Sequence, residues 1–356
     1  MKHLLVDISA HGYGHLAQTA PVVDAMVGLM PGLRVTVRSA SPPDILRQHF
    51  NCSFQLVPCE IDFGMRMLDA VEVDVSGSLA AYRDYHSGWD DKVSRAAAEM
   101  RLMAPDLILA NVPYLSLAAA HQADIPAVAM CCLNWADIYR HYAGNDAGSL
   151  IIQRQMQAAY DSAACFLKVL PAMPMCDLHN VHEIQPIARR GQDRRAEIER
   201  LIPGGKNEKL VLVGMGGIAY RLPMARWLRH ENVRWIVPAD WDVQRDDTLV
   251  FESLGMSFSD VLASCDAVLT KPGYGIFTEA ACAGVPLLYV SRGNWPEQPC
   301  LVEWLEQNGV CREIEAAALQ RGELGAALSA LWGKVKPPRP AANGANQAAG
   351  ILAGWL

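Results

Sequence analysis

Short apolar segments alternate with longer amphipathic segments along most of the chain, and this alternation is the feature that most constrains its fold. Residues 2–8 form a short apolar run, a turn with two glycines follows, and residues 16–29 have the apolar spacing of a helix. Further apolar runs and amphipathic segments repeat this order. Strands that are apolar on both faces and alternate with helices build parallel sheets with helices on both sides. The sequence therefore predicts an α/β fold.

The chain is long enough to need two hydrophobic cores, because 356 residues exceed what one core usually organises. A second series of strands and helices begins at residues 210–213, and its first strand also runs into a glycine-rich turn. Between the two series, over residues 171–191, the pattern weakens and prolines recur, which indicates a connection between domains. We therefore expect one α/β domain at residues 1–185, completed by a C-terminal helix at 343–356, and a second at residues 186–342.

Charge and cysteine content narrow the possible functions. Lysine and arginine number 31 against 38 aspartates and glutamates, and this mild acidity argues against a nucleic-acid partner, whose phosphates need a basic surface. The ten cysteines form no C-x-x-C pair and lie mostly in apolar runs, which indicates buried thiols in a reducing compartment. No run of about 18 apolar residues could span a bilayer. We expect a cytoplasmic protein, and peripheral contact with a membrane surface stays open.

The most informative segment combines a strand end, a glycine-rich turn and the start of a helix. Gly273 and Gly275 let the backbone turn sharply, and the N–H groups of a helix expected from about Ile276 form a site for an anion such as a diphosphate. Lys271 adds a positive charge beside it. Glu279, about one turn into the helix, would be repelled by phosphate and suits a neutral group such as ribose hydroxyls. The alternative is a plain turn in which Glu279 complements the helix dipole.

Two histidines, His11 and His15, lie in the first glycine-rich turn. This turn is expected at the carboxyl end of the sheet, where open α/β folds place their chemistry, and a neutral imidazole there could accept a proton from a hydroxyl. The alternative for either histidine is to cap the helix or to bond a backbone carbonyl. Metal binding by the pair is not expected, because Gly12 and Gly14 make this stretch a turn and no third ligand is indicated.

A further polar pair, Asn134 and Asp137, follows an apolar strand expected at residues 127–131. Its place at another carboxyl end of the sheet suits an acceptor pocket. A capping and packing role is the alternative.

Two motifs resemble a known enzyme family. Residues 270–279 align without gaps to the T-H-C-G-W-N-S-x-x-E signature of UDP-glycosyltransferases, with Gly273 and Glu279 matching and Tyr274 in the place of the tryptophan. The nearby W-P-E-Q at 295–298 resembles the D-Q pair of that family, and H-G-Y-G-H near the N-terminus resembles its first-domain turn. The likeness is tighter to the cell-wall GlcNAc transferase family and to the glycosyltransferase-like N-terminal part of plant L-arabinokinases, in which K-x-G-Y-G recurs.

The resemblance implies a GT-B fold, in which two Rossmann-like domains with parallel sheets face a cleft. It implies a glycosyltransferase with a nucleotide sugar, foremost a UDP-sugar, as co-substrate and no metal or other cofactor. The donor contacts that it implies are Glu279 for the ribose hydroxyls; the N–H groups of Gly275 and Ile276, with Lys271, Gly273 and Tyr274 around them, for the diphosphate; Gly216 and Gly217 for the phosphates; Phe258 for the base; and Glu297 and Gln298 for the sugar hydroxyls.

In the first domain the resemblance implies that His15 is the base, with His11 as its competitor, in a transfer that inverts the anomeric carbon. Lys271 replaces a phosphate-contacting histidine of the family. Asn111 replaces the aspartate that orients the base, and an amide can fix a tautomer but cannot stabilise an imidazolium by charge. The acceptor, a small molecule or a lipid-linked one, is not specified. The alternatives are a nucleotide-sugar epimerase of the same fold and an inactive nucleotide-sugar-binding protein, which the amide of Asn111 motivates.

Overall fold

The structure is a computed structural model that describes residues 1–202, 208–217 and 221–356. The chain divides into two compact units, each with its own parallel sheet. The first unit comprises Met1–Leu68, Val73–Ile187 and Ala342–Leu356, and the second comprises Asp69–Glu72 and Ala188–Ala341.

The first unit is built on a seven-stranded parallel sheet in the order β3-β2-β1-β4-β5-β6-β7. Its strands are β1 (His3–Ile8), β2 (Arg34–Ser39), β3 (Gln55–Pro58), β4 (Leu107–Asn111), β5 (Ala127–Cys131), β6 (Cys165–Val169) and β7 (Val181–Ile184). All residues of β1, β4 and β5 are buried, because helices cover both faces of the sheet at its centre.

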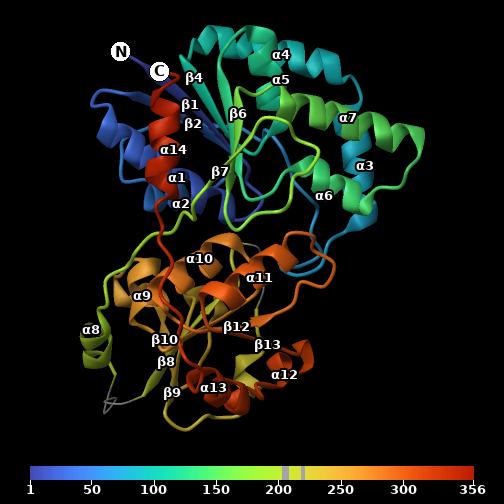
Figure 1. Ribbon diagram of the computed structural model, residues 1–356. Helices are drawn as coiled ribbons and strands as arrows, with labels where there is room; N and C mark the ends of the chain where they lie inside the picture. The colour runs from blue at the N-terminus through green and yellow to red at the C-terminus, as the bar shows by residue number, and fades with distance from the viewer. Residues whose placement is uncertain (203–207, 218–220) are drawn as a thin grey trace. The chain divides into compact units, whose positions relative to one another are not determined.

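Helices form a layer on each face of this sheet. Its helices are α1 (Gly14–Leu29), α2 (Pro43–His49), α3 (Val75–His86), α4 (Trp89–Met103), α5 (Tyr114–Ala123), α6 (Trp135–Tyr142), α7 (Ala147–Asp161) and α14 (Gly344–Ala353). The helices α4, α5 and α7 pack side by side in one layer, and α1 packs against α2 and α14 in the other (Figure 1). The C-terminal helix therefore completes the layer that the first helix of the chain begins.

The second unit is built on a six-stranded parallel sheet in the order β10-β9-β8-β11-β12-β13. Its strands are β8 (Lys209–Gly214), β9 (Val233–Val237), β10 (Thr248–Val250), β11 (Ala267–Thr270), β12 (Leu287–Val290) and β13 (Cys311–Ile314). Its helices are α8 (Arg195–Arg200), α9 (Phe258–Ser264), α10 (Tyr274–Ala283), α11 (Gln298–Asn308), α12 (Ala316–Arg321) and α13 (Gly325–Trp332), with 3-10 turns η1 (Met224–Arg226), η2 (Ala239–Trp241) and η3 (Phe251–Leu254). Helices α9 and α11 flank α10 on one face of the sheet (Figure 1).

The predicted α/β class with two parallel sheets is confirmed, and one local expectation is wrong. Val181–Ile184 forms the edge strand β7, although the region around it reads as a connection, because two of its four residues are exposed and it lacks an apolar run. The stretch between β3 and α4 contains α3, whose start Asp74 caps by accepting a hydrogen bond from the N–H of Gly77. Within the described residues, no helix has both the length and the apolar character needed to cross a membrane.

Candidate active site

Three neighbouring strands of the first sheet end in polar or sulfur-bearing groups that meet at one point. His15 lies in the first turn of α1, the helix that follows β1, while Asn111 is the last residue of β4 and Cys131 the last of β5. The ring Nδ1 of His15 lies 2.9 Å from Asn111 Oδ1 and 3.5 Å from Cys131 Sγ. All three residues are buried, with His15 only 5% exposed. The structure therefore brings together the predicted His15 and Asn111 and adds Cys131.

The surrounding hydrogen bonds determine which ring nitrogen of His15 is the base. The amide nitrogen of Asn111 donates to Gln18 Oε1 at 3.3 Å and to the His15 carbonyl at 3.4 Å, so its oxygen must face the imidazole. A carbonyl oxygen accepts only, so Nδ1 of His15 carries the hydrogen. The neutral ring then has its lone pair on Nε2, which is the arrangement that a general base needs.

Burial and the Cys131 sulfur act in opposite directions on the pKa of His15. Burial lowers it, and the charge and hydrogen bond of Cys131, followed by the hydrogen bond to Asn111, raise it above the ordinary value. Burial raises the pKa of Cys131, and Cys132 and His15 lower it below the ordinary thiol range. Each member of the pair favours the charged form of the other, so the protons of the two groups are coupled.

A buried carboxylate and an indole lie beside the histidines. Asp62, 7% exposed, accepts a hydrogen bond from Trp135 Nε1 at 2.8 Å. The Trp135 ring centroid lies 5.2 Å from that of His11 and 5.7 Å from that of His15. Gly64 packs directly against His11 and Trp135. Its φ is +60°, and a Cβ there would lie 2.8 Å from both His11 Cγ and the Trp135 ring. Only glycine lets the segment after Asp62 approach the two rings so closely.

Asn134 and Asp137 form the start of α6. Asn134 caps the helix by accepting a hydrogen bond from the Asp137 N–H at 2.8 Å, and its amide donates to Asp137 Oδ2 at 2.8 Å. Asp137 also pairs with Arg140. These contacts match the capping alternative, and an acceptor-binding role for the pair stays a prediction.

In the second unit, the carboxyl ends of three adjacent strands carry most of the residues expected to bind a donor. The strand β8 runs into Gly216 and Gly217, β11 into Lys271, and β12 into the segment that leads to α11. Gly216 has φ +80°, and a Cβ there would lie 3.5 Å from Lys271 Nζ. The glycine turn therefore packs against the ammonium group. Glycine is the residue that adopts a backbone with positive φ at no steric cost.

Lys271 is 8% exposed, and burial lowers its pKa to about 7. The positive charge of Arg292 lowers this pKa as well, while the Glu297 carboxylate raises it. A buried ammonium beside another cation is stabilised by an incoming anion, because the anion restores the lost solvation and offsets the repulsion. The site is electrostatically suited to phosphate groups.

Helix α10 begins beside Lys271. It starts at Tyr274, two residues before the start expected from the sequence, because Gly273 is extended and takes the N-cap position. No side chain caps this end and no acidic residue lies in the first turn. The N–H groups of Gly275 and Ile276 belong to that turn and have no acceptor within the helix. A phosphate would be favoured there by both the N–H groups and the helix dipole.

Glu279 lies one turn further along α10, next to the segment that enters the second unit. Burial raises its pKa to about 7, and the charge and the backbone N–H of Arg189 act to lower it. The carboxylate thus already has one donor from the chain. A hydroxyl group of a ligand is a suitable further partner for a carboxylate in this position, and the predicted ribose contact stays a prediction.

The predicted pair Glu297 and Gln298 lies at the start of α11, where Glu297 is the N-cap residue and Gln298 the first residue of the helix. Glu297 accepts a hydrogen bond from Trp295 Nε1 at 2.9 Å, and Gln298 accepts one from the Arg292 N–H at 2.7 Å. The Arg292 guanidinium lies 4.1 Å from the centroid of the Trp295 ring. These contacts hold the loop after β12 in one conformation, with a carboxylate and two cations close together.

Phe258, the residue expected near the base, is the first residue of α9 and is 38% exposed. A Cβ on Gly214 would lie 3.4 Å from Phe258 Cζ and 2.9 Å from Ile276 Cδ1. The aromatic ring, the end of β8 and the start of α10 are therefore in contact. All the predicted donor-site residues belong to this one unit.

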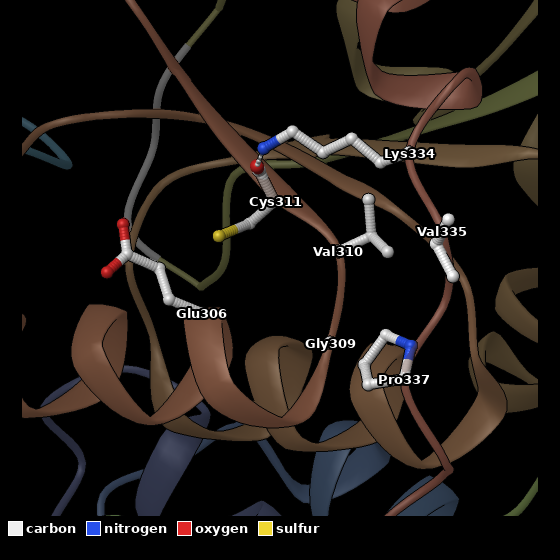
Figure 2. Close-up of a pocket in the computed structure, with 7 residues that line it drawn as sticks. All are labelled: Glu306, Gly309, Val310, Cys311, Lys334, Val335 and Pro337. Carbon is white, nitrogen blue, oxygen red and sulfur yellow. Dashed lines mark hydrogen bonds between the residues drawn. The ribbon is translucent and has the colours of Figure 1, made fainter.

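A surface cavity of about 390 Å³ in the second unit lies elsewhere (Figure 2). Its lining is Glu306, Gly309, Val310, Cys311, Lys334, Val335 and Pro337, and Lys334 Nζ donates to the Cys311 carbonyl at 2.8 Å. The cavity adjoins the amino end of β13, whereas the donor-site residues follow the carboxyl ends of their strands. It is not part of the candidate site.

Metal ligands are not grouped anywhere in the ranges that the structure describes: no three histidine, cysteine or acidic side chains converge there in an arrangement for an ion.

Sequence reasoning missed Asp62, Cys131, Trp135 and Arg292. Cys131 ends a predicted strand and Asp62 follows another closely, so the rule that directs attention to carboxyl ends of strands could have found both. No such rule of sequence position directs attention to the side chains of Trp135 and Arg292.

Comparison with known proteins supports the fold and the relation inferred from the motifs. No family model matches the chain. L-arabinokinase of Arabidopsis thaliana is 24% identical over 323 residues, which is 86% of this chain and 30% of that protein. The chain therefore spans less than a third of this relative.

Two solved structures illustrate the fold. The kitacinnamycin glycotransferase matches with a TM-score of 0.67 at 18% identity, over 99% of each chain. The spinosyn rhamnosyltransferase SpnG complexed with thymidine diphosphate matches with a TM-score of 0.57 at 15% identity, over 100% of this chain and 96% of the other. The chain has the GT-B fold. Its predicted likeness to L-arabinokinase is confirmed.

Proposed function

We propose that the protein is a glycosyltransferase that moves a sugar from a nucleotide donor, foremost a UDP-sugar, to a hydroxyl of a small-molecule or lipid-linked acceptor. The observation that carries this proposal is the 2.9 Å contact between His15 Nδ1 and Asn111 Oδ1, which leaves Nε2 as a base at the carboxyl end of β1. The GT-B fold and the clustered cation, glycine turn and helix start of the second unit support it. Thymidine diphosphate bound to SpnG makes dTDP-sugars the second donor class to test.

The proposed reaction is a direct displacement. His15 Nε2 takes the proton of the acceptor hydroxyl while that oxygen forms a bond to the anomeric carbon from the face opposite the diphosphate. The bond from the anomeric carbon to the phosphate oxygen breaks, and its electron pair leaves with the nucleoside diphosphate. Attack from the opposite face inverts the anomeric configuration. The asparagine at position 111 fixes the tautomer of the neutral ring before the proton is taken.

The developing negative charge on the diphosphate needs stabilisation. Lys271 and the N–H groups at the start of α10 would supply it, so the proposed transfer needs no metal ion. Glu279 would hold the ribose hydroxyls and Glu297 and Gln298 those of the sugar. Each of these roles is carried by a residue of the second unit.

Donor binding is tested first, by thermal unfolding with UDP, dTDP and GDP. A ligand at about 100 times its dissociation constant stabilises by about 2.7 kcal/mol, which shifts the melting temperature by a few degrees. We expect UDP or dTDP to produce this shift, Glu279→Gln to weaken it, and Glu315→Gln, a change at the N-cap of α12 in the same unit, to leave it unchanged. Absence of a shift with every nucleotide would contradict the donor assignment.

Turnover is tested next, with the donor that binds and a panel of hydroxyl acceptors, with and without EDTA. Loss of a general base typically costs 10²- to 10⁴-fold in rate, so His15→Gln should lower kcat by about that factor and leave the nucleotide-induced shift intact. Nucleoside diphosphate released without acceptor would instead favour an epimerase. Binding without consumption of donor would favour an inactive binding protein, the alternative that Asn111 motivates.

A further inference from the structure

The site in the first unit contains a buried carboxylate, Asp62, to which the reaction proposed for His15 and Asn111 gives no role. Asp62 lies after β3 in a segment with no regular structure, and it is 7% exposed. A buried carboxylate is costly unless hydrogen bonds and opposite charges compensate it. Asp62 has the Trp135 indole N–H at 2.8 Å as a donor, and no basic residue forms a salt bridge with it within the described residues.

The position of Asp62 is tied to that of the histidines by the indole. The Trp135 ring holds Asp62 by its Nε1 and meets both histidine rings with centroids less than 6 Å away, at 5.2 and 5.7 Å. Gly64, two residues after Asp62, has no room for a side chain against His11 and Trp135. The Trp135 indole therefore links the carboxylate to both imidazole rings, and the backbone two residues further on packs against the same indole.

Asn111 itself brings no charge to His15, and the Cys131 sulfur is the larger source of negative charge beside the ring. When His15 accepts a proton it becomes an imidazolium, and the Asn111 oxygen offers it only a dipole. We propose that Asp62 is a positioning residue: its carboxylate, anchored by Trp135, supplies a second negative charge, after that of the Cys131 sulfur, that stabilises the protonated form of His15. The catalytic consequence rests on the proposed transfer reaction, whereas the electrostatic link between Asp62 and His15 does not.

The charges around the pair agree with this assignment. Burial is the largest effect and raises the pKa of Asp62 above its ordinary value, while Ser9, His15 and Trp135 act to lower it, so a protonated His15 favours the ionised carboxylate. The other groups that bear on His15 or Asp62 are Cys131 from β5, Asp7 from β1, Tyr82 and Tyr85 from α3, Tyr114 from α5 and Tyr160 from α7. Asp7 is neutralised by Arg38 in a buried ion pair. The tyrosines are neutral, because burial raises their pKa values.

The test measures the pKa of His15 directly, by NMR titration of the full protein with isotope-labelled histidine and with His15→Gln to assign the signal. Asp62→Asn keeps an oxygen for the Trp135 N–H and removes the charge, so we expect the His15 pKa to fall by about one pH unit. Trp135→Phe keeps a ring and removes the donor that stabilises the carboxylate, and it should lower the His15 pKa in the same direction. Asp44→Asn, at an exposed carboxylate, is the control and should change nothing.

The outcomes separate this inference from the proposed function. A His15 pKa that is unchanged in folded Asp62→Asn and Trp135→Phe proteins overturns the role of Asp62, whatever the reaction. With an active donor and acceptor pair, Asp62→Asn should lower kcat and move the acid limb of its pH profile to lower pH, with KM for donor unchanged. A lowered His15 pKa in a wild-type protein that transfers no sugar would leave the electrostatic link standing and refute the transferase.

Discussion

At the scale of single residues, the Cys131 sulfur is the unusual partner of the proposed base. It lies 3.5 Å from His15 Nδ1, and it raises the pKa of His15 against the opposing effect of burial. A thiol is not usually part of a base that takes protons from hydroxyls. Because the two groups favour each other's charged forms, a change at Cys131 must appear in the titration of His15.

Replacing Cys131 by alanine should therefore lower the pKa of His15. The base acts in its neutral form, so activity is lost as the pH falls through this pKa, and a lower pKa moves the loss to lower pH. We expect the acid limb of kcat/KM to move down by about one pH unit, because this limb reports the free enzyme. Cys165→Ala, on the neighbouring strand β6, is the matched control. An acid limb that stays at the same pH would show that the Cys131 sulfur does not affect the pKa of His15.

The titration of Lys271 predicts a second pH dependence, in the affinity for the donor. Burial lowers its pKa to about 7, so the ammonium that attracts the diphosphate is present below that pH and is lost as the pH rises through it. Phosphate groups are almost fully ionised by pH 7 and add little to the trend above it. We expect the affinity for UDP or dTDP, measured by calorimetry, to fall with increasing pH by at most about tenfold per unit.

An arginine in place of Lys271 is the diagnostic variant, because its guanidinium stays charged throughout this range. The affinity of Lys271→Arg should be nearly constant between pH 6.5 and about 8.5, whereas Lys271→Met should bind weakly at every pH. A wild-type slope that persists in the arginine variant would assign the dependence to another group.

At the scale of elements, the sequence predicted strands, turns and sites where one local rule decides the outcome. Strands with every residue buried, such as β4 and β5, are visible as apolar runs, and the rule that chemistry follows strand ends led to His15 and Lys271. Asn111 was identified only through the resemblance to UDP-glycosyltransferases. The half-exposed β7 carries no such run. Asp62 and Trp135 come together only in the folded unit, across 73 positions of sequence, so no local pattern could pair them.

The start of α6 gives a prediction at this scale. Asn134 is 1% exposed, and its oxygen accepts a hydrogen bond from the first turn of the helix. An N-cap replaced by alanine typically costs about 1 kcal/mol, and the buried amide adds to that. Asn134→Ala should lower the free energy of unfolding by about 1–2 kcal/mol, and Asn134→Ser, which can still cap, by less, in urea denaturation.

The same pair of variants decides between the two interpretations of Asn134. If the residue only caps α6, both proteins will keep the acceptor KM of the wild type once folded. A raised acceptor KM in the stable serine variant would show that the amide also contacts the acceptor.

At the scale of the whole molecule, the first unit is assembled from distant parts of the chain. Helix α14, with Ala348, Ala349 and Leu352 buried, packs on α1, and the N–H of Gly344 donates to the Pro186 carbonyl at 3.1 Å. The approach is close, since a Cβ on Gly344 would lie 1.9 Å from the Gln185 carbonyl oxygen. The apolar face of α1 is therefore completed only by residues that follow the entire second unit.

This arrangement predicts that a fragment ending at residue 187 is incomplete. Without α14 it exposes the face of α1 that the helix covers, and we expect it to be unstable or aggregated. Fusing residues 342–356 to it through a flexible linker should restore a cooperative unfolding transition, because linker length adds only a slowly growing entropic cost. The same fusion with Leu352→Ala should lose about 2–5 kcal/mol of that stability, as large-to-small changes in a packed core do, whereas Trp355→Ala, at a side chain that is 45% exposed, should change little. A fragment of residues 1–187 that unfolds cooperatively by itself would show that α14 is dispensable for the first unit.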